Sequence, residues 1–143
     1  MRRWYHARME GARSPEPPAT PLAGRATVAG AAEGILQHGD DTWPLWVFEF
    51  VDDFRATLDP RLAADPPTSD LTPRLRALLA CVVEALCSEL GLPTPEWSLA
   101  TPPLAHPWFV SGVENLKAMA LVESPAWFRR RNVFVLGNFL NRA

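Results

Sequence analysis

Three consecutive arginines, Arg129, Arg130 and Arg131, follow two aromatic residues, Trp127 and Phe128, near the end of the sequence. Guanidinium groups bind carboxylates and phosphates through paired hydrogen bonds, and aromatic and arginine side chains often dominate interface energies. These five residues are therefore predicted to bind a partner. The alternative is structural: the arginines would be the solvated end of a short helix, where positive charge stabilises the helix dipole. Successive helical residues point about 100° apart, so at most two of the three arginines could face one surface.

The acidic residues and histidines give weaker indications of a metal site or of acid–base catalysis. Glu49 and Asp53 are four residues apart on a predicted helix and could share a metal ion, but no histidine or third carboxylate accompanies them. We expect both to lie on a solvated helix face. His106 stands alone in a proline-rich segment and is expected to be a packed or surface residue rather than a general base.

Cys81 and Cys87 lie six residues apart within one predicted helix, about 240° apart around its axis and about 9 Å apart along it. This geometry excludes a disulfide between them while the helix persists. Because no further cysteine or histidine pair has the spacing of metal ligands, the two thiols are expected to be core residues. We expect neither a metal site nor a cofactor.

Sequence motifs of common enzymes are missing. The chain contains no phosphate-binding glycine loop, no paired-cysteine zinc site, and no HExxH, GxSxG or HxE motif. Its three histidines and two cysteines have no spacing that supports a catalytic triad. We therefore predict a binding protein rather than an enzyme, with no catalytic residues.

Charge is distributed unevenly, although the net charge is only −2. Residues 1–27 carry five arginines and two glutamates, residues 28–123 carry five basic and fourteen acidic side chains, and residues 124–143 carry four arginines and no acid. An acidic body repels a phosphate backbone, so nucleic acid is not the expected partner. The alternative function is a regulatory or structural protein that contacts nucleic acid through its basic termini.

Two amphipathic helices, over residues 43–58 and 73–90, are predicted to build the core, because apolar residues recur there at intervals of three and four. Shorter helices are predicted over residues 28–37, after Ser111, and after Ser124 and Pro125. Thr42, Thr72 or Asp70, Ser111 and Ser124 are the expected caps. The apolar segment after residue 131 is predicted to be either a short strand with a helical turn or a tail docked on the core.

The fold class predicted is all-α: a compact single-domain bundle of five or six helices with a proline-rich connecting segment and a docked C-terminal tail. Residues 1–27 show no helical or strand period and contain the proline-rich run SPEPPATP, which predicts a disordered leader before a helical domain of residues 28–143. No apolar run reaches the roughly 18 residues that cross a membrane, and no apolar signal-peptide core is present. A cytoplasmic protein is therefore expected.

Several motifs of residues 43–143 resemble those of a known bacterial family. They are WVFEFVDDFRATLDPRLAADPP, GLPTPEW, HPWF, NLKAMALVESPAWFRRRNVFV and the closing LNRA. Their order resembles that of small, uncharacterised helical proteins encoded beside nucleotidyltransferase-like toxins and regarded as their antitoxins. The resemblance implies a module that binds and neutralises such a toxin, and it carries no catalytic residue. It also implies that residues 129–131 pair with acidic groups on that enzyme, whose active site holds carboxylates for metal ions.

Overall fold

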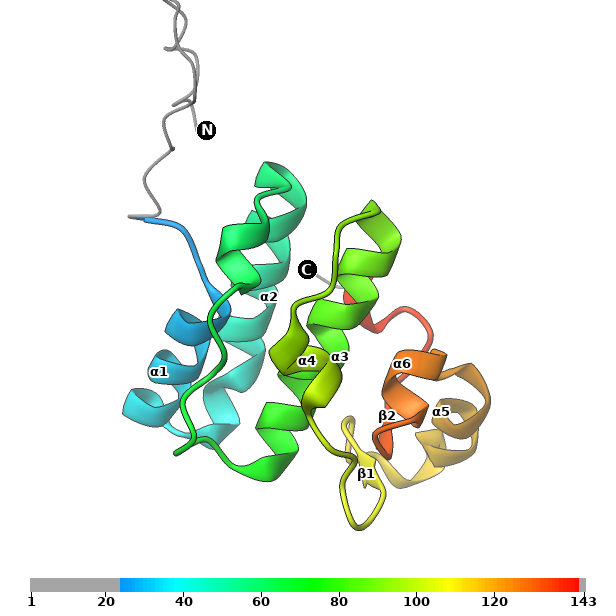
Figure 1. The fold of residues 1–143 in the computed structure, drawn as a ribbon. Helices are drawn as coiled ribbons and strands as arrows, with labels where there is room; N and C mark the ends of the chain where they lie inside the picture. The colour runs from blue at the N-terminus through cyan, green and yellow to red at the C-terminus, as the bar shows by residue number, and fades with distance from the viewer. Residues whose placement is uncertain (1–23, 142–143) are drawn as a thin grey trace, which may run out of the picture.

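Six α-helices and one small sheet make up residues 24–141, the part of the chain that the computed structural model describes (Figure 1). The helices are α1 Val28–His38, α2 Trp43–Thr57, α3 Pro73–Leu90, α4 Glu96–Ala100, α5 Lys117–Glu123 and α6 Ala126–Arg129. The strands are β1 Trp108–Phe109 and β2 Val133–Phe134, and 3-10 turns occupy Asp40–Thr42, Pro60–Ala63, Glu114–Leu116 and Phe139–Asn141. The predicted single all-α domain is confirmed, with the sheet as an addition.

The predicted leader falls mostly outside this description, since residues 1–23 are not among the described residues. Its last residues belong to the fold. Thr27 caps α1 by accepting a hydrogen bond from Gly30 N at 2.9 Å, and the amide of Ala26 donates to the Asp53 carboxylate at 2.7 Å. Ala26 and Thr27, which were predicted to belong to the leader, are therefore part of the helical domain.

Helix α3 lies at the centre of the molecule, with α1 and α2 on one side and α5, α6 and the sheet on the other (Figure 1). From residue 77 to residue 87 every side chain of α3 is buried. The helix begins at Thr72, which caps it by accepting from Leu75 N at 3.4 Å, and ends at Gly91, whose φ of 70° is left-handed. The predicted bounds of this helix are confirmed, and of its two candidate caps the structure shows Thr72.

Helix α2 also has its predicted position, with Thr42 at its N-cap as expected but without a capping hydrogen bond. The Thr42 hydroxyl donates to the carbonyl of Gly39 at 2.6 Å and accepts from the Trp46 indole at 3.1 Å. The indole packs on α1 at Gly34, where an added Cβ would come within 2.5 Å of the ring. Glycine has a low helix propensity, but at position 34 its missing side chain permits close packing of α1 against α2.

The proline-rich segment after α3 crosses the core with one short helix, α4. The Trp97 indole donates to the carbonyl of Ala63 at 2.8 Å, and the buried Ser98 hydroxyl donates to the carbonyl of Ala80 on α3 at 2.8 Å. Trp97, Leu104 and Trp108 of this segment pack against the core. Phe109 stacks on Phe134, with ring centroids 5.1 Å apart.

The two strands pair in parallel, with Trp108 beside Val133 and Phe109 beside Phe134. Of the two predictions for the last segment, the strand followed by a helical turn is confirmed: β2 is followed by the 3-10 turn Phe139–Asn141. The pairing joins the proline-rich segment to the segment that follows α6.

Two predicted serine caps are wrong. Ser111 accepts from Val113 N at 3.2 Å, but α5 begins only at Lys117, after a 3-10 turn. Ser124 does not cap α6; it is buried, accepts from Val135 N at 2.8 Å, and its hydroxyl lies 2.6 Å from the carbonyl of Ala120. The Ser124 hydroxyl therefore links the end of α5 to the backbone just after β2, and it does not cap α6.

Candidate partner-binding site

Helix α6 and the two residues after it carry all five side chains predicted to bind a partner, but these side chains point in different directions. Phe128 is fully buried and packs edge-on against Phe139, with centroids 5.8 Å apart. Arg131 is 5% exposed, whereas Arg129 and Arg130 are exposed and Trp127 is half-buried. Because four residues make about one helical turn, a helix this short must divide consecutive side chains between core and solvent.

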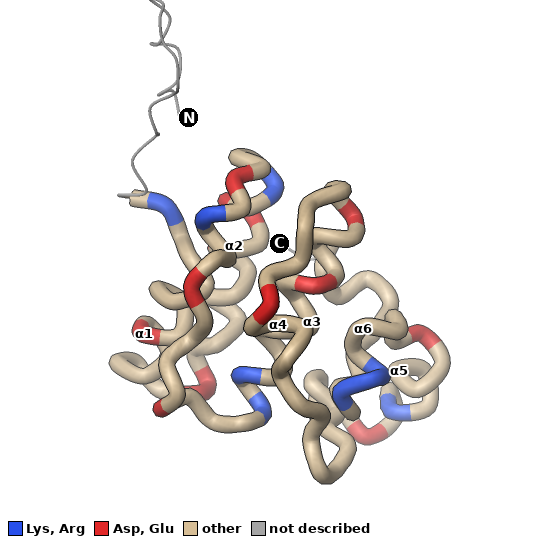
Figure 2. Tube along the Cα trace, in the orientation of Figure 1, with Lys and Arg blue, Asp and Glu red and all other residues tan. Residues whose placement is uncertain are grey.

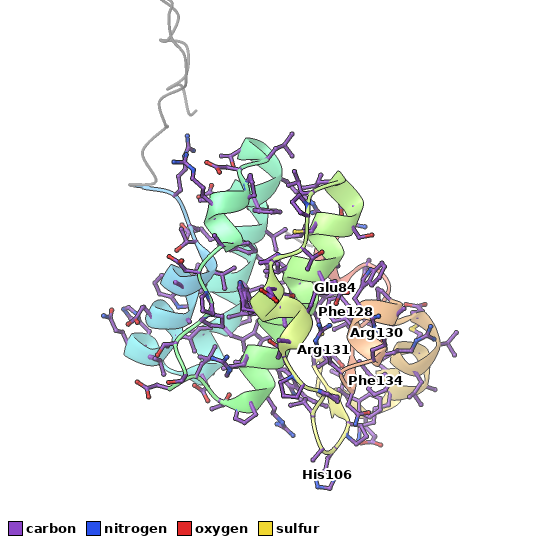
Figure 3. All side chains as sticks on the ribbon, in the orientation of Figure 1. Glu84, His106, Phe128, Arg130, Arg131 and Phe134 are labelled. Atoms are coloured by element: carbon purple, nitrogen blue, oxygen red, sulfur yellow. The ribbon has the colours of Figure 1, made fainter. Side chains whose placement is uncertain are left out.

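Arg131 is held inside the protein by Glu84 of α3 (Figure 3). Its Nη1 lies 2.8 Å from Oε1 of Glu84, and the two side chains are 7% and 9% exposed. The same guanidinium donates to the backbone carbonyls of Ser98 at 2.7 Å, Trp127 at 3.1 Å and Thr101 at 3.3 Å. Arg131 therefore links α3, α4 and α6 through one planar group.

Arg130 occupies the other oxygen of the same carboxylate. Its Nη2 lies 2.6 Å from Oε2 of Glu84, and its side chain is 58% exposed. The guanidinium also lies 5.6 Å from the Trp127 ring centroid, within the range of a cation–π contact. Glu84 thus pairs with one buried and one exposed arginine, and both of its oxygens are satisfied.

Arg129 differs from its two neighbours. Within residues 24–141 its side chain forms no ion pair or hydrogen bond. Trp127, Arg129 and Arg130 are the members of the predicted site that reach solvent, and we call them the α6 surface. Phe128 and Arg131 lie inside the fold, where they position this surface but cannot touch a partner docked on it. Partner binding by the α6 surface stays a prediction.

The two cysteines lie in the core and are free thiols, as expected. Burial raises the pKa of Cys81 to about 12, although the nearby Arg131 guanidinium opposes that shift. Burial also raises the pKa of Cys87. Both groups are therefore neutral thiols at physiological pH, so neither resembles an activated nucleophile.

Other candidate residues are spread over the surface. Asp53 accepts from the amide of Ala26, Glu49 is exposed, and His106 is exposed at the tip of the loop before β1 (Figure 3). In residues 24–141 no three histidine, cysteine or acidic side chains are grouped closely enough to hold a metal ion. The chemistry available at the α6 surface is charge pairing by its arginines and apolar contact by Trp127.

Glu84 is the important residue that the sequence reasoning missed. It is the one charged residue between positions 77 and 87, within the most apolar stretch of α3. A charged side chain in a helix that is buried all round needs an internal partner. That signal points to a buried arginine or lysine, but not to which of the fourteen basic residues supplies it.

Comparison with known proteins adds no relative: no family model matches the chain, and neither do curated proteins or solved structures. Among the described residues, no helix combines the length and the apolar character needed to span a membrane.

Proposed function

We propose that this protein is a protein–protein interaction module that acts as an antitoxin, binding and neutralising a nucleotidyltransferase-like toxin in the cytoplasm. The resemblance of residues 43–143 supports the kind of partner. The α6 surface supports the mode of binding, because it combines an aromatic side chain with two exposed guanidinium groups, the residue types that most often dominate interfaces.

The observation that carries the proposal is the fixed position of the α6 surface. Phe128 fills the core directly beneath it, and Arg131 ties its backbone to α3 and α4. Trp127 and Arg130 pack on one another above that base. A surface that is ordered before binding loses little conformational entropy when a partner docks.

Arginine chemistry suits an enzyme whose active site depends on carboxylates. Arg129 has no internal partner among the described residues, so its guanidinium can pair with a carboxylate at no cost to the fold. Arg130 can share its charge between Glu84 and a partner because more than half of its side chain is exposed. Occupation of metal-binding carboxylates by these groups would block the toxin.

Co-purification of the tagged chain with the product of the adjacent gene tests the proposal. Arg129→Ser is the informative variant, and Arg74→Ser, at an exposed arginine on α3, is its matched control. We expect Arg129→Ser to melt like the wild type and to retain less partner, while Arg74→Ser retains all of it. Partner retention unchanged by Arg129→Ser would argue against the α6 surface.

A mobility-shift assay with DNA and RNA at physiological salt separates the two candidate functions. The proposed antitoxin gives no shift, whereas a protein acting through basic termini gives a clear one that weakens as salt rises. A wild-type chain that shifts nucleic acid and does not retain the adjacent gene product would refute the antitoxin proposal.

A further inference from the structure

Helix α5, next to the α6 surface, presents apolar side chains to solvent. Met119, Leu121 and Val122 are 49%, 49% and 79% exposed, and Ala118 is also exposed. The only buried member of the helix is Ala120. We call Ala118, Met119, Leu121 and Val122 the α5 face.

Helix geometry shows how complete this face is. At 100° per residue, Ala118 and Val122 lie almost opposite the buried Ala120, and Met119 and Leu121 lie about 100° to either side of it. The solvent-facing half of α5 is therefore apolar throughout. A surface helix ordinarily carries polar residues there, and contiguous exposed apolar patches mark sites of interaction.

The charges around the α5 face differ from those of the rest of the molecule. Residues 24–112 carry five basic and twelve acidic side chains, whereas residues 113–141 carry four basic and two acidic ones. Both acids of the second group have internal contacts: Glu114 pairs with Lys117 at 3.2 Å, and Glu123 accepts from Gly137 N at 2.8 Å. Arg129 of the α6 surface, by contrast, has no internal partner among the described residues. Figure 2 shows the basic residues of this part of the chain near α5 and α6.

This charge distribution selects the occupant. A second copy placed symmetrically on the same face would bring the exposed arginines of one chain toward those of the other, and like charges at an interface oppose association. A protein surface with an apolar centre and acidic side chains at its edge complements both features. We infer that the α5 face and Arg129 together form a docking surface for such an acidic-edged protein surface; this inference rests on the proposed function and extends its site from α6 to α5.

The inference assigns separate roles to the two parts of the surface. The apolar side chains of α5 provide affinity by leaving water when the partner docks, with little dependence on salt. Arg129 provides attraction to acidic groups, which salt screens when the contact is exposed. Binding at this surface therefore has one component that salt weakens and one that it does not.

Calorimetric titration of the purified adjacent gene product into the chain tests the inference. The variants are Met119→Ser combined with Val122→Ser, which removes apolar contact without adding charge, and Arg129→Ser. Leu45→Ser is the control, because Leu45 is 64% exposed on α2, away from the α5 face. We expect at least a tenfold loss of affinity for the double variant at low and high salt, a loss for Arg129→Ser that is larger at low salt, and unchanged affinity for Leu45→Ser.

Each other outcome overturns the inference in a distinguishable way. A wild-type chain that binds, together with a double variant that binds equally well, overturns the role of α5 and leaves the proposed function standing. A wild-type chain that does not bind overturns both. A concentration-dependent dimer of the wild type in sedimentation equilibrium, abolished in the double variant, would show that the occupant is a second copy.

Discussion

Removal of the Arg131 guanidinium should be among the most destabilising single changes in the described part of this protein. Arg131→Ala leaves the Glu84 carboxylate, 9% exposed, with one of its two cationic partners, and it deprives three backbone carbonyls of a donor. Breaking a buried ion pair by removing one partner typically costs about 3–5 kcal/mol. Because Arg130 remains on the other oxygen of Glu84, we expect about 3 kcal/mol.

Two further variants separate burial from charge. Arg131→Lys keeps the positive charge, but an ammonium group cannot reproduce the fork that reaches carbonyls on α4 and α6, so we expect a loss of about 2 kcal/mol. Arg130→Ala removes the more exposed partner of the same carboxylate and should cost about 1 kcal/mol or less. The expected order of stability is therefore Arg130→Ala, then Arg131→Lys, then Arg131→Ala as the least stable.

Urea unfolding followed by circular dichroism measures these differences, provided that the slope of the transition is the same for all chains. The reasoning depends on the burial of Arg131 rather than on the number of arginines removed. If Arg131→Ala lowered the free energy of unfolding no more than Arg130→Ala does, the buried position of Arg131 would be refuted.

Three other changes have defined outcomes. Gly34→Ala should lower the free energy of unfolding by about 1–3 kcal/mol in urea, although alanine favours helix, because its Cβ would overlap an indole ring of α2. Cys81 and Cys87 should resist alkylation at about pH 8 in the folded chain, because burial raises both pKa values, and both should react in denaturant as measured by mass spectrometry. The hydrogen bond from Arg61 lowers the pKa of Asp59 from 3.8. The ionised carboxylate therefore stabilises the fold above pH 3.8, and this stabilisation disappears as the pH falls through the lowered pKa. The urea midpoints of Asp59→Asn and the wild type should differ at neutral pH and approach one another as the pH falls below 3.8.

The main helices were predictable from sequence because their signals are local. The apolar spacing in α2 and α3 follows the helical period, and Thr72 and Gly91 act within one turn of the ends they define. Such features depend only on neighbouring residues. The structure accordingly places α3 at its predicted bounds and α2 one residue short of them.

The candidate site was predictable only in part, because its organisation depends on contacts between distant residues. Nothing local distinguishes Arg131 from Arg129; the difference arises from Glu84 and from the Ser98 carbonyl on two other helices. Ser124 has the spacing of a helix cap, but the backbone of Val135, eleven residues later and just after β2, provides partners for its hydroxyl. Pairing of β1 with β2 likewise depends on tertiary packing, since two residues do not show a strand period.

The contact between Arg131 and Glu84 has a consequence for the order in which the molecule assembles. The two residues are 47 positions apart, so the chain must close a long loop before Arg131 reaches Glu84, whereas α1 packs on α2, and α2 on α3, through elements that follow one another in sequence. The segment that carries α5 and α6 should thus dock late in folding and detach early under stress. Its detachment would remove Phe128 from the core and dismantle the docking surface at the same time. A partner that recognises this surface would bind fully folded chains selectively, and by mass action it would protect them from local opening and from proteolysis.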